Sequence, residues 1–265
     1  MSVVGRASSP VPQADNPRIK EIVRNKVKIF FIVKISFEDY FLVHILDKFM
    51  FKFLCNLYAE KKKKRTLSIR ISTDGFCFCD YIPSKPGSLN YFFYNTDKEK
   101  SLAVNFRAGF EEAPFADKEN YSCIKCIVET AEFTAIPLEY DDRNDYKQFF
   151  KHCFPHGNSN AEIVANRLNA QGYTIIFPVD KGIYEEISSL GETSIYTPAS
   201  ILAGFITNAP FNEERYMLAY FQGKHALFLS TRERKAELMN IFGNTNSQDT
   251  LFYMLSMWKE QGFSQ

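Results

Sequence analysis

The chain has 265 residues, of which 45% are hydrophobic and 24% charged, and its formal net charge is +1. This composition excludes a disordered or collagen-like protein and predicts a globular protein with a sizeable buried core. Six cysteines are too few for a disulfide scaffold, and no signal peptide precedes them, so we expect a cytoplasmic protein.

The near-zero net charge conceals two parts of opposite sign. Residues 1–65 contain fourteen Lys or Arg and six Asp or Glu, a balance of +8. Residues 66–265 contain eighteen Lys or Arg and twenty-five Asp or Glu, a balance of −7. An asymmetry of this size usually marks a boundary. We therefore expect residues 1–65 to form a basic, Phe- and Lys-rich head, partly disordered or helical, that is separate from the rest of the chain.

The apolar part of the head, residues 29–57, is not expected to span a membrane. Charged side chains such as Lys34, Asp47 and Lys48 interrupt every window of about 20 residues, which is the length that a spanning helix needs. Three alternatives stay open. The segment could be an amphipathic helix at an anionic surface, anchored by the basic run at 61–65; a helix packed on the body; or upstream sequence translated from a misplaced start codon.

The body, residues 66–265, repeats one predicted order of elements: a hairpin, a third strand and a helix. In the first copy these lie at 66–82, 89–95 and 98–110, and in the second at 216–230, 236–242 and 247–262. The turn glycines Gly75 and Gly223 are 148 residues apart, and Gly109 and Gly262, where the two helices are expected to end, are 153 apart. The nearly constant offset predicts an internal duplication.

Between the two copies the sequence predicts further strands and helices. Strands or extended pieces are expected at 123–130, 133–140 and 174–179, and helices at 141–154, 161–171, 183–190 and 197–207, with Gly172 ending the second of these helices. A mixed sheet with flanking helices is the arrangement that such an order favours.

Duplicated three-stranded units, each followed by a helix, describe the actin-like ATPase fold, which has two ribonuclease-H-like subdomains around a nucleotide cleft. The stretches LSIRISTDGFCF (67–78), FTAIPLE (133–139) and LSMWKEQGF (255–263) resemble a Bacteroides-type uncharacterised family, domain of unknown function 3822, which is assigned this fold. The resemblance implies an α/β protein with a first lobe at 66–208 and a second at 213–265.

The second lobe is shorter than the resemblance implies. Members of the family continue after the helix at its end into another strand and helices, so we expect a truncated second lobe with an open sheet edge. A dimer formed through this open edge is one alternative for a partner. An unknown protein partner is the other.

A phosphate loop is the feature that this fold would use to bind a nucleotide. Such a loop needs an Asp, a Gly and a Thr or Ser, and the candidates here are Thr73, Asp74 and Gly75 in the first hairpin and Gly223 and Lys224 in the second. The second loop has no acidic residue, and an Asp-Gly pair is also a common hairpin turn. Binding of a Mg-nucleotide therefore stays an alternative, and we assign no cofactor and no catalytic residue.

Two cysteine pairs raise the alternative of a zinc site. Cys77 and Cys79 share one face of a predicted strand, and Cys123 and Cys126 have the spacing of a zinc knuckle. The second pair lacks the Gly or Pro of a tight turn, and buried cysteines are common in strands. We therefore expect no metal site.

The function that these observations favour is a non-catalytic regulatory or partner-binding role. A nucleotide-binding ATPase or kinase-like enzyme is the first alternative, and binding to an anionic surface through the basic head is the second. Nucleic acid is not an expected partner, because the −7 balance of the body repels phosphate.

Overall fold

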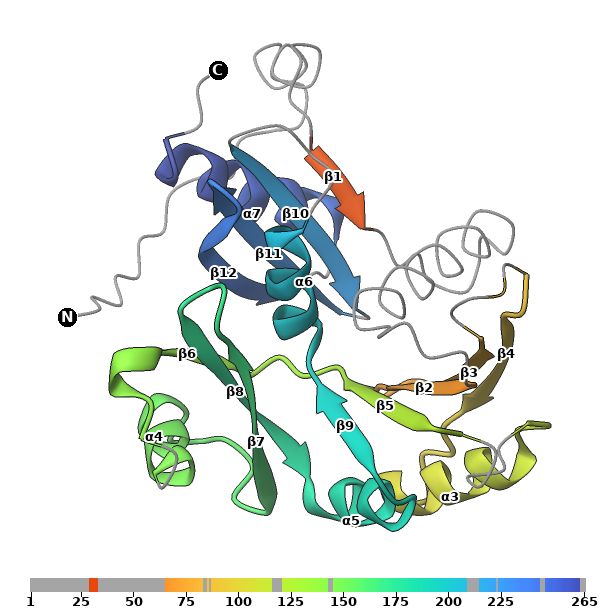
Figure 1. Ribbon diagram of the computed structural model, residues 1–265. Coiled ribbons are helices and arrows are strands. Elements are labelled where there is room, and N and C mark those ends of the chain that lie inside the picture. Colours follow the sequence, from red (N-terminus) through yellow and green to blue (C-terminus); the bar gives the residue numbers. More distant parts are fainter. Residues whose placement is uncertain are drawn as a thin grey trace.

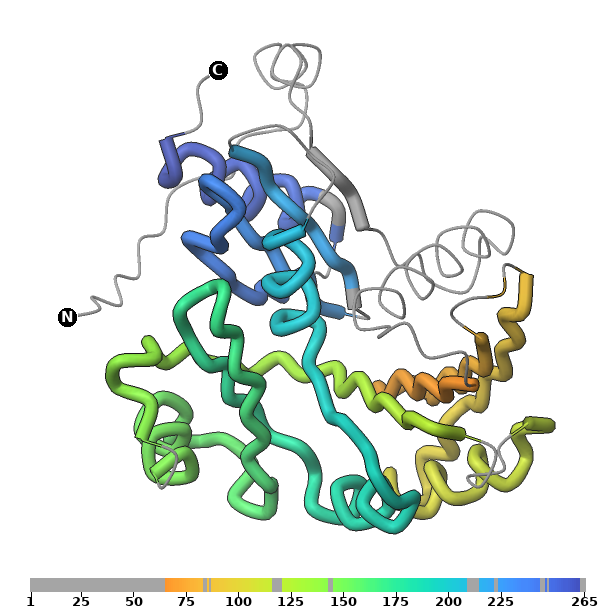
Figure 2. Tube along the Cα trace, viewed as in Figure 1, coloured from red at the N-terminus to blue at the C-terminus, as the bar shows by residue number. Residues whose placement is uncertain are grey.

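The structure is a computed structural model of the chain, and it describes residues 29–32, 65–82, 85, 87–115, 121–142, 145–208, 215–222, 224–243 and 246–262. The described elements form three sheets and their flanking helices (Figure 1). The chain passes through a first lobe, then through one buried helix, and then into a second lobe, as the colour gradient of Figure 2 shows.

A five-stranded sheet forms the centre of the first lobe. Its strands, in the spatial order β4-β3-β2-β5-β9, are β4 (Asn90–Asn95), β3 (Gly75–Tyr81), β2 (Thr66–Ile71), β5 (Cys123–Val128) and β9 (Thr193–Tyr196). The first three strands are antiparallel, β5 runs parallel to β2, and β9 runs parallel to β5. The predicted hairpin and third strand are therefore confirmed, whereas the short polar strand β9 was not predicted.

Helix α3 (Leu102–Glu112) packs against β3 of this sheet, and α5 (Lys181–Ser189) packs beside α3. The alternation of Phe76 and Phe78 with cysteines along β3 places both rings against Phe106 of α3, with centroids 5.5 and 6.2 Å apart. Gly109 lies inside α3, whose last residue is Glu112, so the expected helix end at this glycine is wrong. Its missing side chain allows the ring of Tyr94 to pack directly against the helix, because an added Cβ would lie 2.8 Å from that ring.

A separate three-stranded antiparallel sheet has the order β6-β8-β7, with β6 (Thr134–Pro137), β8 (Tyr173–Asp180) and β7 (Ala161–Leu168). The short helix η2 (Leu138–Tyr140) follows β6, and α4 (Tyr146–Cys153) packs beside β7 and β8. α4 begins five residues later than the helix expected at 141–154.

The helix predicted at 161–171 is wrong, because these residues form β7 and the turn that follows it. Ile163 packs into a cluster with Ile176 and Phe150, while the next residue, Val164, faces the main core on the opposite side. Pairing with β8 along the whole strand overrides the helix propensity of the sequence. Gly172, which was expected to end a helix, has φ +85° in the hairpin turn.

The second lobe contains β10 (Arg215–Gln222), β11 (His225–Arg232), β12 (Lys235–Gly243) and α7 (Ser247–Glu260). The three strands form an antiparallel meander, and α7 covers one face of it. Strand, strand, strand and helix thus follow in the same order in both lobes, which confirms the predicted repeat. A fourth strand, β1 (Ile29–Ile32), pairs in parallel with the free edge of β10.

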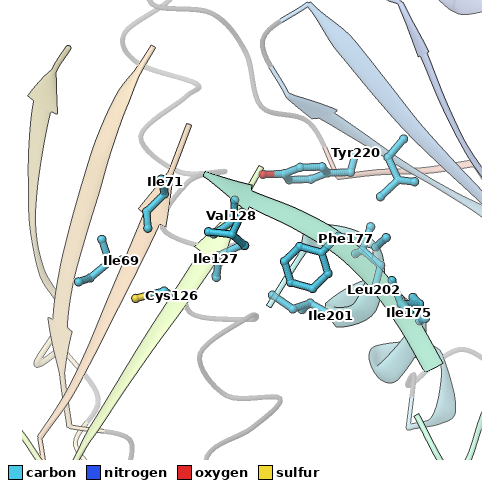
Figure 3. Close-up of a cluster of buried hydrophobic side chains, with 14 of the residues drawn as sticks. Ile69, Ile71, Cys126, Ile127, Val128, Ile175, Phe177, Ile201, Leu202 and Tyr220 are labelled. Atoms are coloured by element: carbon cyan, nitrogen blue, oxygen red, sulfur yellow. The ribbon is translucent and has the colours of Figure 1, made fainter. Parts of the chain in front are cut away.

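One helix and one core join the two lobes. Helix α6 (Pro198–Thr207) lies between the lobes in Figure 1, and all but two of its residues are buried. Ile201 and Leu202 of α6 share a cluster of buried side chains with Ile69 of the first lobe and with Leu218 of the second. Figure 3 shows this continuity, since the labelled side chains come from β2, β5 and β8 of the first lobe, from α6 and, with Tyr220, from β10 of the second lobe.

Candidate functional site

The two lobes meet through a buried polar cluster at the carboxyl ends of β2 and β5. These strands are parallel and paired in register, so the residues at their ends lie side by side. Arg70 Nη1 lies 3.0 Å from Glu129 Oε1, and the hydroxyl of Tyr220, on β10, donates to the same oxygen at 2.7 Å. In Figure 3 the Tyr220 hydroxyl points toward Val128, the last residue of β5. We call Arg70, Glu129 and Tyr220 the inter-lobe cluster.

The charges of the inter-lobe cluster are well shielded from water. The side chain of Arg70 is 12% exposed and that of Glu129 is 7% exposed. Burial alone would lower the pKa of Arg70, but the negative charge of Glu129 raises it above its ordinary value. The guanidinium also lies over the ring of Phe93, 6.0 Å from its centroid. Arg70 therefore stays charged, and Glu129 supplies the opposite charge that its burial requires.

The first predicted phosphate loop is the turn of residues 72–75, which follows the last residue of β2, Ile71. Ser72 N donates to the carbonyl of Gly75 at 3.1 Å, and the Ser72 hydroxyl contacts the carboxylate of Asp74. Thr96 holds the turn from the side, because its hydroxyl donates to the carbonyl of Thr73 at 3.1 Å. The side chains of Thr73 and Asp74 are exposed. These contacts close the turn on itself and on the end of β4.

Gly75 has a packing role in this turn. A Cβ at this position would lie 2.5 Å from the carbonyl oxygen of Tyr94 and 2.6 Å from Cζ of Phe93, both on β4. Real Cβ atoms do not approach other atoms this closely, so the close approach of β3 to β4 requires glycine here. The packing of β4 thus explains why position 75 is a glycine, without a bound phosphate.

The second predicted loop is the turn between β10 and β11. Lys224 is exposed in this turn, and Gly223 lies outside the described residues. One contact from this lobe to the first runs through Tyr220, two residues before the end of β10. Two more involve Gln171 of the first lobe, whose side chain donates to the carbonyl of Arg234 at 3.1 Å and accepts from the N–H of Ala236 at 2.9 Å. The described part of both turns offers a single carboxylate, Asp74, for a magnesium ion. Binding of a Mg-nucleotide by these residues stays a prediction.

Sequence reasoning missed all three members of the inter-lobe cluster. Glu129 carried a usable signal, since an acidic residue directly after the buried strand CIKCIV needs a partner. Arg70 carried a weaker one, as a charge inside an alternating strand. Tyr220 carried none, because its contact with Glu129 joins residues 91 positions apart.

The four cysteines of the zinc alternative do not converge. Cys126 pairs with Ile69, whereas Cys77 pairs with Arg70 and Cys79 with Ser68, on the opposite face of the sheet. Burial raises the pKa of the Cys126 thiol, which belongs to the main core. Among the residues that the structure describes, no group of three or more His, Cys, Asp and Glu is arranged to hold a metal ion.

The basic run at 61–65 is described only at its last residue. Arg65 Nε donates to the carboxylate of Asp80 at 3.0 Å, and its guanidinium lies 5.7 Å from the centroid of the Tyr121 ring. Arg65 is therefore bound to the first lobe, and the four lysines before it lie outside the described residues. Within the described ranges, no helix combines the length and the apolar character that crossing a membrane requires.

Comparisons with known proteins agree with this architecture. A family model described as "Protein of unknown function (DUF3822)" matches residues 55–265. A crystal structure from Bacteroides thetaiotaomicron VPI-5482, described as a protein with actin-like ATPase fold and unknown function, is 27% identical. The match covers 77% of this chain and 80% of that chain, with a TM-score of 0.66.

Two further solved structures are similar only at low identity. The PilM-PilN type IV pilus biogenesis complex is 7% identical with a TM-score of 0.42, over 77% of this chain and 67% of that chain. A PPX-GPPA enzyme of Aquifex aeolicus is 11% identical with a TM-score of 0.38, over 75% and 64%. No curated protein matches the chain.

The family model covers most of the chain, and the Bacteroides structure carries the same fold over a similar span. The α/β architecture with two repeated lobes is therefore the actin-like ATPase fold, and the chain belongs to the DUF3822 family.

Proposed function

We propose that this protein works by binding another protein and does not turn over a nucleotide. The fold alone would allow either role. The argument therefore depends on what the loop residues of this chain do.

The packing of Gly75 is the observation that carries the proposal. Its Cα faces the ring of Phe93 and the carbonyl of Tyr94, so the glycine is used to bring β3 and β4 together. The Ser72 hydroxyl, which a phosphate loop would offer to the ligand, contacts Asp74 and the carbonyl of Gly75 instead. The polar groups of the turn are thus engaged within the fold.

The inter-lobe cluster supports the same conclusion. In an enzyme that closes on a nucleotide, charged groups between the lobes are expected to face the phosphates. Here the Arg70 guanidinium is paired with Glu129 and lies over Phe93, and Tyr220 completes the contact from the second lobe. The positive charge of Arg70 is therefore already paired with a carboxylate of the protein.

Isothermal titration of the full chain with Mg-ATP tests the nucleotide part of the proposal. We expect no saturable heat up to millimolar ligand. The matched control is Asp74→Asn, which removes the one carboxylate of the turn and should give the same trace. A saturable one-to-one heat that Asp74→Asn weakens would overturn the proposal and favour the enzyme alternative.

Size-exclusion chromatography tests the partner part. In a lysate of the bacterium that encodes the protein, at native expression, we expect it to elute earlier than the purified chain at the same concentration. Salt at high concentration should shift it back if the contact is polar. Elution of the native protein at the position of the purified chain would contradict a stable partner.

A further inference from the structure

The free edge of β10 is filled by a strand from near the start of the chain. β1 runs parallel to β10 with Ile29 opposite Met217, Phe30 opposite Leu218, Phe31 opposite Ala219 and Ile32 opposite Tyr220. The edge that the sequence predicted to be open is thus paired within the same chain. The pairing covers the middle of β10, residues 217–220, and includes the strand position of Tyr220.

The place of β1 in the second lobe corresponds to the place of β5 in the first. The first-lobe order is β4-β3-β2-β5, and the second-lobe order is β12-β11-β10-β1. In both sheets the first strand of the meander has an antiparallel neighbour on one side and a parallel neighbour on the other. The two fourth strands differ in origin, because β5 follows its meander in the chain whereas β1 precedes it.

β10 has the properties of an interior strand. Met217, Leu218 and Ala219 are fully buried, with Leu218 in the main core and Met217 and Ala219 against α7. A strand that is apolar on both faces and unpaired along one edge would leave backbone N–H and C=O groups without partners in a buried setting. Strand β1, with the sequence IFFI, has the β-branched and aromatic composition that suits such a position.

We propose that residues 29–32 act as an intramolecular donor strand, which completes the second-lobe sheet in the position that β5 fills in the first lobe. The head then has a structural role, because it supplies the parallel neighbour that β10 lacks in its own lobe. Strand β1 also pairs with the part of β10 that contains Tyr220, whose hydroxyl donates to Glu129. The head is therefore connected to the inter-lobe cluster through β10.

Paired cysteines test the register directly. Phe31 and Ala219 are partners and lie on the same side of the sheet, so mild oxidation of the Phe31→Cys/Ala219→Cys variant should give an intramolecular disulfide, located by peptide mapping. The matched control is Phe30→Cys/Ala219→Cys, which is shifted by one residue and places the two thiols on opposite faces. Equal yields from the two variants, or disulfide-linked dimers in place of the intramolecular product, would overturn the proposal.

Hydrogen exchange of the full chain measures the consequence for β10. One of any two adjacent strand residues directs its N–H toward the neighbouring strand, so Phe30→Pro/Phe31→Pro must remove a ladder contact if β1 forms. We expect exchange in peptides covering 215–222 to speed up by about tenfold or more, while peptides covering 66–71 keep their rate.

The control for the proline variant is Ser8→Pro/Ser9→Pro, which introduces two adjacent prolines outside β1. It should leave the exchange rates of the 215–222 and 66–71 peptides unchanged. Unchanged exchange of 215–222 in the Phe30→Pro/Phe31→Pro variant would overturn the proposal. If that variant does not fold, the two cysteine pairs still decide, because they share the Ala219→Cys change and differ only in which of two adjacent β1 residues carries the second thiol.

Discussion

The two lobes bury their central strands equally well but by different means. Leu67 and Ile69 of β2 are fully buried, and so are Met217 and Leu218 of β10. β2 has neighbours from its own lobe on both sides, whereas β10 has β11 on one side and β1 on the other. The second lobe therefore reaches the same burial with fewer elements of its own.

The difference shows where the second lobe obtains its stability. One face of its sheet, with Leu218 and Leu227, belongs to the same cluster of buried side chains as Ile69 of the first lobe. The other face, with Met217 and Phe228, packs against α7. Because the larger core is shared, we expect the two lobes to unfold together in one cooperative transition.

Breaking the inter-lobe cluster should have the largest effect. Glu129→Gln leaves the charge of Arg70 buried without its opposite charge, so the free energy of unfolding should fall by about 3–5 kcal/mol in a denaturant titration. The matched control is Glu162→Gln, whose partner Lys147 is exposed and whose loss should stay within about 1 kcal/mol. Equal losses from the two variants would contradict the burial of the Arg70–Glu129 pair.

Truncation in the shared core tests the expected cooperativity. Leu227 is fully buried in the main cluster, and Leu227→Ala should reduce the free energy of unfolding by about 2–5 kcal/mol. Fluorescence of the one tryptophan, Trp258 in α7, and far-UV circular dichroism should report the same midpoint. Phe252→Ala, at a side chain that is 54% exposed, is the control and should change little. Separate midpoints for the two signals would contradict a shared core.

A pair of glycine substitutions compares the first-lobe sheet with the second-lobe sheet. We expect a smaller change in the free energy of unfolding than for the core truncation. Gly75→Ala forces a Cβ against β4, so we expect a loss of about 1–3 kcal/mol in the free energy of unfolding. Gly243→Ala, at the end of β12, meets no atom within 4 Å and should be close to neutral. A neutral Gly75→Ala would remove the packing explanation for this glycine.

The pH dependence of stability should reveal the buried thiol of the first lobe. Burial raises the pKa of Cys126 in the folded chain, so this thiol keeps its proton where the unfolded chain, with an ordinary pKa of 9.0, has lost it. Its contribution is complete below pH 9.0 and is lost as the pH rises, by about 1.4 kcal/mol per pH unit. Cys126→Ala should lower stability near neutral pH but flatten this slope. An unchanged slope would contradict the burial of the thiol.

The sequence predicted elements whose signal is local. The alternation in LSIRI and FCFCD, with polar turn residues between them, identified β2 and β3 because one face of each strand is apolar. The same kind of signal failed at 161–168, where Ile163, Val164 and Ala165 stand in a row and fit either period. Those residues become a strand through pairing with β8, which a local pattern does not contain.

The candidate site was less predictable than the fold. The turn of residues 72–75 was located correctly, but its glycine serves the contact with Phe93 and Tyr94, which are about 20 residues away in the chain and come close only through β3–β4 pairing. Tyr220 reaches Glu129 only after both lobes have formed. Residues that act within one strand or turn were therefore visible in the sequence, and those that act between lobes were not.

Thermal unfolding of the full chain with and without about 5 mM Mg-ATP tests the central claim most directly. That claim is that the turn of residues 72–75 makes its contacts within the protein and does not bind a nucleotide. A ligand present at about 100 times its Kd stabilises the state that binds it by about 2.7 kcal/mol, which would raise the midpoint by several degrees. We predict no change in the midpoint. A rise of several degrees that Asp74→Asn abolishes would show that the turn binds the nucleotide.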